Sequence, residues 1–110
     1  MSRTLSLPVT MSPEAAARVA QLGFQQAADD LLAQSCVLLP GLRSIHLSLV
    51  PSYEMDDIPW LVLECLSDRP EREARDALVA WYGWRADNLP FQVGRHFMLE
   101  WVEHQERHAG

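Results

Sequence analysis

Apolar and polar residues alternate along three stretches of the chain, and a two-residue period is typical of strands that bury one face. These stretches are residues 5–11, 45–49 and 96–102. Residues 60–66 are apolar at nearly every position, which predicts a central strand that is buried on both faces. Pro8 lies in the first stretch and has no N–H group to donate, so this strand is expected to lack full pairing.

Two longer stretches show the three- and four-residue spacing of amphipathic helices. The first follows Ser12-Pro13-Glu14, a favourable helix start, and is predicted to reach about Gln34. The second starts near residues 67–71, where serine or aspartate can cap it, and its inward stripe includes Trp81.

The second helix carries Trp81, Tyr82, Gly83 and Trp84 in succession. Gly83 either ends the helix in a left-handed conformation, with Trp84 folded back as a lid, or is tolerated in a helix that reaches Ala86. Burial explains the aromatic rings in both cases, because each tryptophan brings a large apolar area. The alternative is that the group forms a recognition surface that includes Trp84.

The predicted order of elements is β-α-β-β-α-β, which is the order of the ferredoxin-like fold. We therefore expect an α+β sandwich in which two helices cover one face of a four-stranded antiparallel sheet, with strand order 4-1-3-2. Residues 1–103 are expected to form a single domain, and the polar residues 104–110 a flexible tail. Pro8 fits poorly in a first strand that would be central.

The composition narrows the possible functions and partners. The chain has 110 residues and a net charge of −6, and its nine arginines are scattered, which argues against nucleic-acid and anionic-membrane binding. We expect a cytoplasmic protein, because there is no secretory signal and no apolar run of about 18 residues. Cys36 and Cys65 lie in apolar segments without CxxC spacing, so we expect buried free thiols and no metal or cofactor.

Strand alternation assigns a second set of side chains to the uncovered face of the sheet. This face mixes apolar residues with hydroxyl, imidazole and carboxylate groups, and such a patch is typical of an interface. The expected binding residues are His46, Trp60, Glu64 and His96. The expected interaction surface comprises Val62, Leu66 and Met98, together with Trp84.

No specific catalytic motif is present, and the candidate sites for acid–base chemistry or metal binding are weak. His46 and Glu64 would be neighbours if their strands pair in register, and could then form an acid–base pair. In the 4-1-3-2 order His46 and His96 would lie about 14 Å apart, too far to share a metal ion. The acidic segment 54–57 lacks the EF-hand pattern, and His104 and His108 could bind a metal only in a helical tail.

Residues 60–103 resemble a group of small uncharacterised bacterial proteins. In that group a strand leads to an Asp-Pro-type helix start, an Ala-rich helix, a Trp-bearing turn with Asn, and a last strand ending in an aliphatic residue and Glu. Arg85 stands where members commonly carry a second tryptophan. The resemblance implies a shared α+β fold and no activity. The matching positions are Asp68, Pro70, Ala77, Leu78, Trp84, Asn88, Gly94, Val102 and Glu103.

We therefore predict a non-catalytic interaction module that binds itself, as a homodimer, or another protein through the open sheet face or a strand edge. One alternative is a small-molecule-binding protein or cofactor-free enzyme of the dimeric α+β barrel kind, in which an enclosed cavity is expected. Another is an accessory or antitoxin-like subunit, which would bind a partner encoded nearby more tightly than it binds itself.

Overall fold

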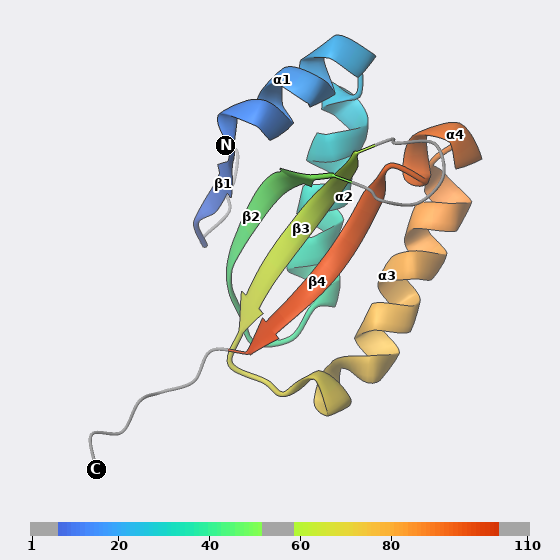
Figure 1. The fold of residues 1–110 in the computed structure, drawn as a ribbon. Coiled ribbons are helices and arrows are strands. Elements are labelled where there is room, and N and C mark those ends of the chain that lie inside the picture. Colours follow the sequence, from blue (N-terminus) through green and yellow to red (C-terminus); the bar gives the residue numbers. More distant parts are fainter. Residues whose placement is uncertain (1–6, 52–58, 104–110) are drawn as a thin grey trace, which may run out of the picture.

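The computed structural model describes residues 7–51 and 59–103, and these form one α+β unit (Figure 1). The sheet contains β1 (Val9–Met11), β2 (Leu42–Val50), β3 (Trp60–Ser67) and β4 (Phe97–Glu103). The helices are α1 (Pro13–Leu22), α2 (Gln25–Leu38), α3 (Arg75–Asn88) and the short α4 (Phe91–Gly94), and a 3-10 turn η1 (Glu71–Ala74) precedes α3.

The predicted ferredoxin-like arrangement is wrong, because the strands lie in the order β1-β2-β3-β4. β1 is parallel to β2, β3 is parallel to β4, and only the central pair β2 and β3 is antiparallel. The elements follow one another as the ferredoxin-like fold requires, but each helical connection returns to the adjacent strand. The sheet is therefore mixed, with two of its three pairings parallel, and is not antiparallel.

The position of β1 resolves the conflict raised by Pro8. β1 is an edge strand that begins at Val9, so Pro8 stands just before it. The carbonyl of Pro8 still accepts a hydrogen bond from the Ile45 N–H group at 3.1 Å. Pro8 has no N–H group, so it cannot donate a bond to the sheet. A proline is tolerated at such an edge position and disfavoured in a central strand.

The first helical stretch is two helices, not the single helix predicted to reach Gln34. Ser12 caps α1 as expected, since its Oγ accepts a hydrogen bond from the Ala15 N–H group at 3.0 Å. Gly23 then adopts φ 73°, a left-handed conformation that glycine enters without steric cost, and this ends α1. α2 starts two residues later and continues to Leu38.

The structure selects the longer form of the second predicted helix. α3 continues through Gly83 to Asn88, so Trp84 lies one turn beyond Trp81 and not in a lid. Trp81 is fully buried, and Trp84 is half-buried against the same core. The start of this stretch differs from the prediction, because β3 extends to Ser67 and α3 begins only at Arg75.

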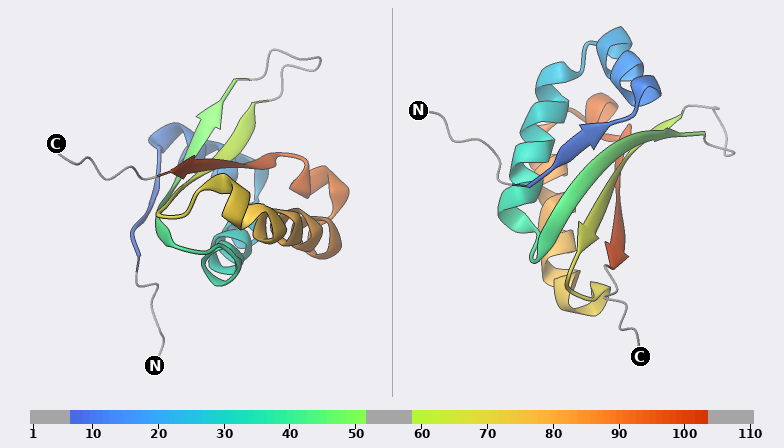
Figure 2. Two further views of the ribbon diagram at one scale, coloured as in Figure 1. Left: turned by 90° about the horizontal axis from the view of Figure 1, so that it is seen from below. Right: turned by 90° about the vertical axis from the view of Figure 1, so that its left-hand side faces the viewer.

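The predicted division of the strand side chains between the two faces is confirmed for the alternating strands. α2 and α3 pack on one face of the sheet, and the other face has no described helix over it (Figure 2). The buried apolar strand side chains on the helix-covered face belong to Ile45, Leu47, Leu61, Leu63, Cys65 and Phe97. No helix within residues 7–51 and 59–103 is long and apolar enough to cross a membrane.

Some predictions concern residues outside the described ranges. The acidic segment 54–57 and the tail residues His104 and His108 belong to this group. Cys36 and Cys65 are both free thiols, as predicted, but only Cys65 is fully buried and Cys36 is half-buried.

Candidate functional site

The sheet face opposite α2 and α3 is the candidate functional site, and we call it the open face. Its side chains alternate along each strand with those of the core, so strand register places them in rows across the sheet. Most of them are half-buried, and Val62 is only 8% exposed. The open face comprises Thr10, Ser44, His46, Ser48, Trp60, Val62, Glu64, Leu66, Met98, Glu100 and Val102.

One polar row crosses all four strands at the middle of the open face. Thr10 pairs with His46, His46 with Glu64, and Glu64 with Glu100. The Thr10 Oγ1 and His46 Nδ1 atoms are 2.7 Å apart, and the Ser48 hydroxyl donates to Glu64 Oε2 at 3.0 Å. These hydrogen bonds fix the orientation of both the imidazole and the carboxylate.

The predicted neighbourhood of His46 and Glu64 is confirmed by the β2–β3 register. The described hydrogen bonds of these two side chains, however, go to hydroxyls: that of His46 to Thr10 on β1, and that of Glu64 to Ser48 on β2. A general acid–base pair needs a direct hydrogen bond or one bridging water. The row is therefore a set of oriented polar groups on a sheet surface, and no described hydrogen bond joins His46 directly to Glu64.

Glu64 and Glu100 stand side by side on β3 and β4. Like charges directly opposite each other across two strands destabilise the sheet. Neither carboxylate forms an ion pair with an arginine or histidine in the described part of the chain. A partner that supplies hydrogen-bond donors to this pair would relieve the repulsion.

His96 does not join the other predicted binding residues. It stands just before β4, and its ring packs edge-on against Phe24, with the ring centroids 5.3 Å apart. Burial lowers the pKa of His96, and the positive charges of Arg95 and Arg18 lower it further. The sequence analysis started the last strand at His96, one residue too early. Arg95 and His96 form a turn after α4, and the alternation begins only with β4.

The predicted interaction residues divide in the same way between the two faces. Val62, Leu66 and Met98 lie on the open face, around the polar row. Trp84 projects from α3 and packs against the core on the other side of the sheet. His46, Trp60 and Glu64 therefore share the open face with three of the four apolar candidates.

Two residues that the sequence analysis missed close part of the β4 edge. The Tyr82 hydroxyl accepts a hydrogen bond from the Leu99 N–H group at 3.3 Å, and Arg85 Nη1 donates to the Phe97 carbonyl at 2.6 Å. These backbone groups belong to the outer side of β4, where an added strand would pair. The three-residue spacing of Tyr82 and Arg85 on one helix face was the available signal.

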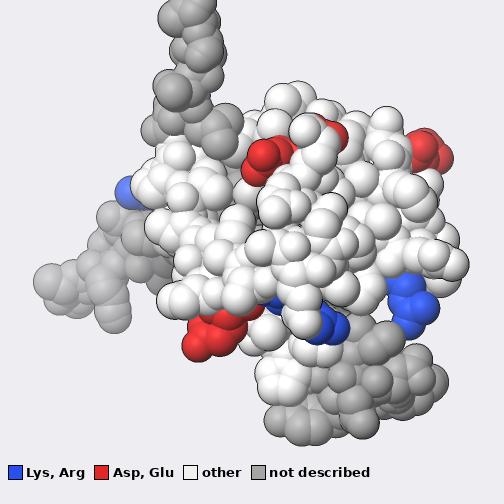
Figure 3. All heavy atoms as spheres, turned by 90° about the horizontal axis from the view of Figure 1, so that it is seen from above, with Lys and Arg blue, Asp and Glu red and all other residues white. Residues whose placement is uncertain are grey.

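The described charged groups show no arrangement typical of a metal centre. Among residues 7–51 and 59–103, no group of three histidine, cysteine, aspartate or glutamate side chains could hold a metal ion. On the face seen from above in Figure 1, arginine and acidic side chains are separated by broad uncharged areas (Figure 3). Comparisons with protein-family profiles, curated proteins and solved structures found no match.

His46→Ala is expected to change the free energy of unfolding by less than about 1 kcal/mol, because His46 is half-buried and makes one described hydrogen bond. Urea unfolding of both proteins would measure this. Ile45→Ala is the matched control, since Ile45 is 1% exposed on the opposite face and its truncation should cost about 2–5 kcal/mol. A larger loss for His46 than for Ile45 would reverse the assignment of the two faces.

Proposed function

We propose that this chain is a non-catalytic interaction module that forms a homodimer through the open face. The observation that supports this most directly is the composition of that face: a fixed polar row flanked by Val62, Leu66, Met98 and Val102. Apolar side chains beside polar groups on a face that no helix covers are typical of protein interfaces. The proposal places the protein in the cytoplasm, because two free thiols suit a reducing compartment.

The strand edges are less suitable for association than the face. β1 has only three residues, which offers a second strand few backbone groups. The first half of β4 is closed by Tyr82 and Arg85, and covered or short edges are common means of preventing edge-to-edge pairing. The alternative of a dimeric α+β barrel needs a ferredoxin-like sheet in each subunit. The observed strand order is not ferredoxin-like, so this alternative loses its structural support.

A second copy fits the polar row through its two-fold symmetry. We consider a two-fold axis that is parallel to the strands and passes above the space between β2 and β3. Rotation about it leaves each residue at the same position along the strand direction and reverses the strand order in the second copy. Each His46 then faces Glu64 of the second copy, and each Thr10 faces Glu100. This arrangement brings donors to the two adjacent carboxylates, whereas an axis above β3 and β4 would stack carboxylate on carboxylate.

The size of the open face sets the expected strength of the dimer. Three strands of seven to nine residues and the three-residue β1, spaced about 4.8 Å apart, cover roughly 400 Å² in projection. Stable interfaces bury about 800 Å² per partner. We therefore expect a weak homodimer that dissociates on dilution.

Val102→Asp is expected to abolish self-association, because it places a third carboxylate beside Glu100 on the open face. Sedimentation velocity over a wide concentration range would measure the monomer–dimer equilibrium. Val79→Asp is the matched control: Val79 is 68% exposed on α3, on the other side of the molecule, and the variant should dimerise as the unmodified chain does.

Two outcomes would reject the proposal. One is an unmodified chain that stays monomeric at every concentration. The other is a Val102→Asp variant that dimerises as strongly as the unmodified chain, which would move the interface away from the open face.

A further inference from the structure

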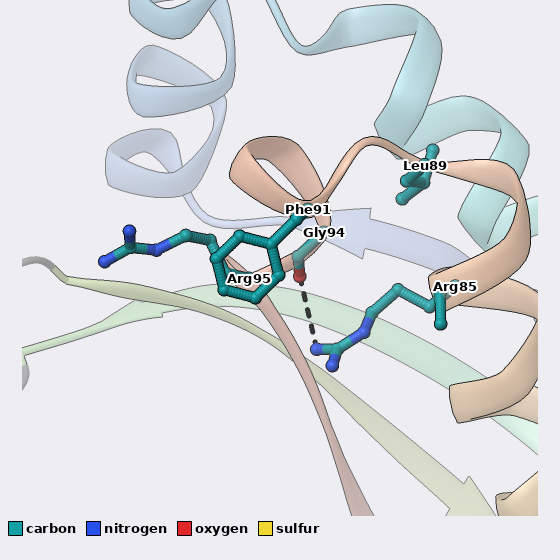
Figure 4. Close-up of a pocket in the computed structure, with 6 residues that line it drawn as sticks. Arg85, Leu89, Phe91, Gly94 and Arg95 are labelled. Atoms are coloured by element: carbon teal, nitrogen blue, oxygen red, sulfur yellow. Dashed lines mark hydrogen bonds between the residues drawn. The ribbon is translucent and has the colours of Figure 1, made fainter.

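A small cavity lies between the end of α3 and α4, away from the open face. Its volume is about 120 Å³, and it is lined by Arg85, Ala86, Leu89, Phe91, Gly94 and Arg95. Figure 4 shows Arg85 reaching from α3 toward the Gly94 carbonyl, with the Phe91 ring beside that carbonyl. The described lining contains two arginines and no carboxylate.

Arg85 is held in a fixed position by groups that leave its charge uncompensated. Its Nη1 donates to the Gly94 carbonyl at 3.2 Å and to the Phe97 carbonyl at 2.6 Å, and its guanidinium carbon lies 5.1 Å from the Tyr82 ring centre. None of these contacts is with an acid. The guanidinium group has five N–H donors, so the Nε and Nη2 donors remain for a ligand.

Gly94 leaves room for this position of Arg85. A Cβ atom on Gly94 would lie 3.3 Å from Cγ and 3.7 Å from Cδ of Arg85. The absence of a side chain at Gly94 therefore gives the Arg85 stem room to pass beneath α4. A guanidinium group ordered before binding loses little conformational entropy when it binds a carboxylate through two hydrogen bonds.

The rim of the cavity is apolar and exposed. Phe91 is 78% exposed, although a phenylalanine is among the side chains most often buried. The guanidinium carbon of Arg95 lies 5.9 Å from the centre of its ring. The cavity thus combines one oriented cation with an exposed aromatic ring, and burial of this ring by a ligand would favour binding.

A second cavity lacks this combination. It is larger, at about 280 Å³, and it lies at the start of α3, lined by Arg72, Arg75, Leu78 and Glu71. The Glu71 carboxylate supplies a negative charge within that lining, so an incoming anion would meet repulsion there. The cavity at Arg85 has no such carboxylate in its described lining.

The volume indicates which kind of carboxylate fits. A cavity of this size holds about four water molecules, well below the roughly 300 Å³ at which small-molecule sites begin. We infer that the Arg85–Phe91 cavity is an anchor site for a glutamate side chain of a partner protein, with an apolar neighbour of that glutamate covering Phe91. This inference does not depend on self-association through the open face.

The test is a titration followed by the backbone amide NMR signals of residues 85–95. The probe is an acetylated, amidated Leu-Glu dipeptide, and the matched control is the same dipeptide with glutamine. Saturable shifts are expected with Leu-Glu, and binding about tenfold weaker is expected with Leu-Gln, since it cannot form the charge-assisted pair. Butyrate, a free carboxylate, should bind more weakly than the dipeptide.

Two variants show which residues bind the probe. Phe91→Ala, at an exposed position, should weaken Leu-Glu binding several-fold, and Arg85→Gln should abolish it, whereas Arg75→Gln removes a positive charge elsewhere on α3 and should change nothing. The free-state spectra establish that each variant is folded. Equal binding of Leu-Glu and Leu-Gln, no saturable shift, or butyrate binding as tightly as the dipeptide would each overturn the inference.

Discussion

Trp81→Ala is expected to lower the free energy of unfolding by about 3–5 kcal/mol. Trp81 is 0% exposed and is one of the largest fully buried side chains. Its Nε1 donates to the Ser35 hydroxyl at 2.8 Å, and that hydroxyl donates to the Leu31 carbonyl at 2.7 Å. The substitution therefore opens a cavity between α2 and α3 and removes the donor that holds the two helices in register.

Urea unfolding monitored by far-UV circular dichroism would measure this loss, since the signal does not depend on the tryptophan itself. Val79→Ala is the matched control on the same helix: Val79 is 68% exposed, and its truncation should change stability by less than about 0.5 kcal/mol. A loss below about 1 kcal/mol for Trp81→Ala would mean that the two helices do not pack as described.

Stability is expected to fall in alkaline solution because of Cys65. Burial, and to a smaller extent the neighbouring Cys36, raises the pKa of the Cys65 thiol from 9.0 to about 12. The folded pKa lies above the unfolded value, so the unfolded chain loses this proton first. The contribution is intact below about pH 9 and is lost as the pH rises toward 12, at about 1.4 kcal/mol per pH unit.

Urea unfolding at several pH values between 8 and about 10.5 would reveal this dependence, and Cys65→Ala is the informative variant. The free energy of unfolding of this variant should decline less steeply with pH than that of the unmodified chain. The variant lacks the thiol whose pKa differs between the folded and the unfolded chain. Cys36→Ala should retain most of the steep decline, since Cys36 is only half-buried. Parallel pH curves for Cys65→Ala and the unmodified chain would contradict the assignment.

Local patterns predicted the local features of this fold correctly. The alternation in β2 and β4 placed Ile45 inside and His46 outside, because neighbouring strand residues must point to opposite faces whatever the strand order. The spacing of apolar residues likewise located Trp81 in the core. These properties depend on a few consecutive residues, and the sequence displays them directly.

The strand order could not be obtained in the same way. Both the ferredoxin-like fold and the observed one follow β-α-β-β-α-β, and they differ only in whether each connection returns to the adjacent strand or leaves a gap. Pro8 was the one residue that argued for an edge position of the first strand. Gly23 ends α1 in a left-handed conformation, a break that the three- and four-residue spacing of this stretch did not show.

The candidate sites show the same division between local and long-range information. The register of His46 and Glu64 followed from the hairpin of β2 and β3, whose strands are neighbours in sequence. His96 was misplaced because a turn interrupts the alternation just before β4. The Arg85–Phe91 cavity brings together residues of α3 and α4 around Gly94, which leaves room for the arginine stem, and no spacing rule predicts this arrangement.

The order β1-β2-β3-β4 also determines how the chain can be divided. Each half of the sequence, residues 9–50 and 60–103, contains a complete parallel pair with its own connecting helices. A peptide-bond cut between Pro51 and Pro59 would leave both pairs whole, and the fragments would have to reassemble through the β2–β3 ladder and the α2–α3 contact. A linker from the last strand to the first would have to cross the whole sheet, because β1 and β4 occupy opposite edges, about 14 Å apart across three strand spacings.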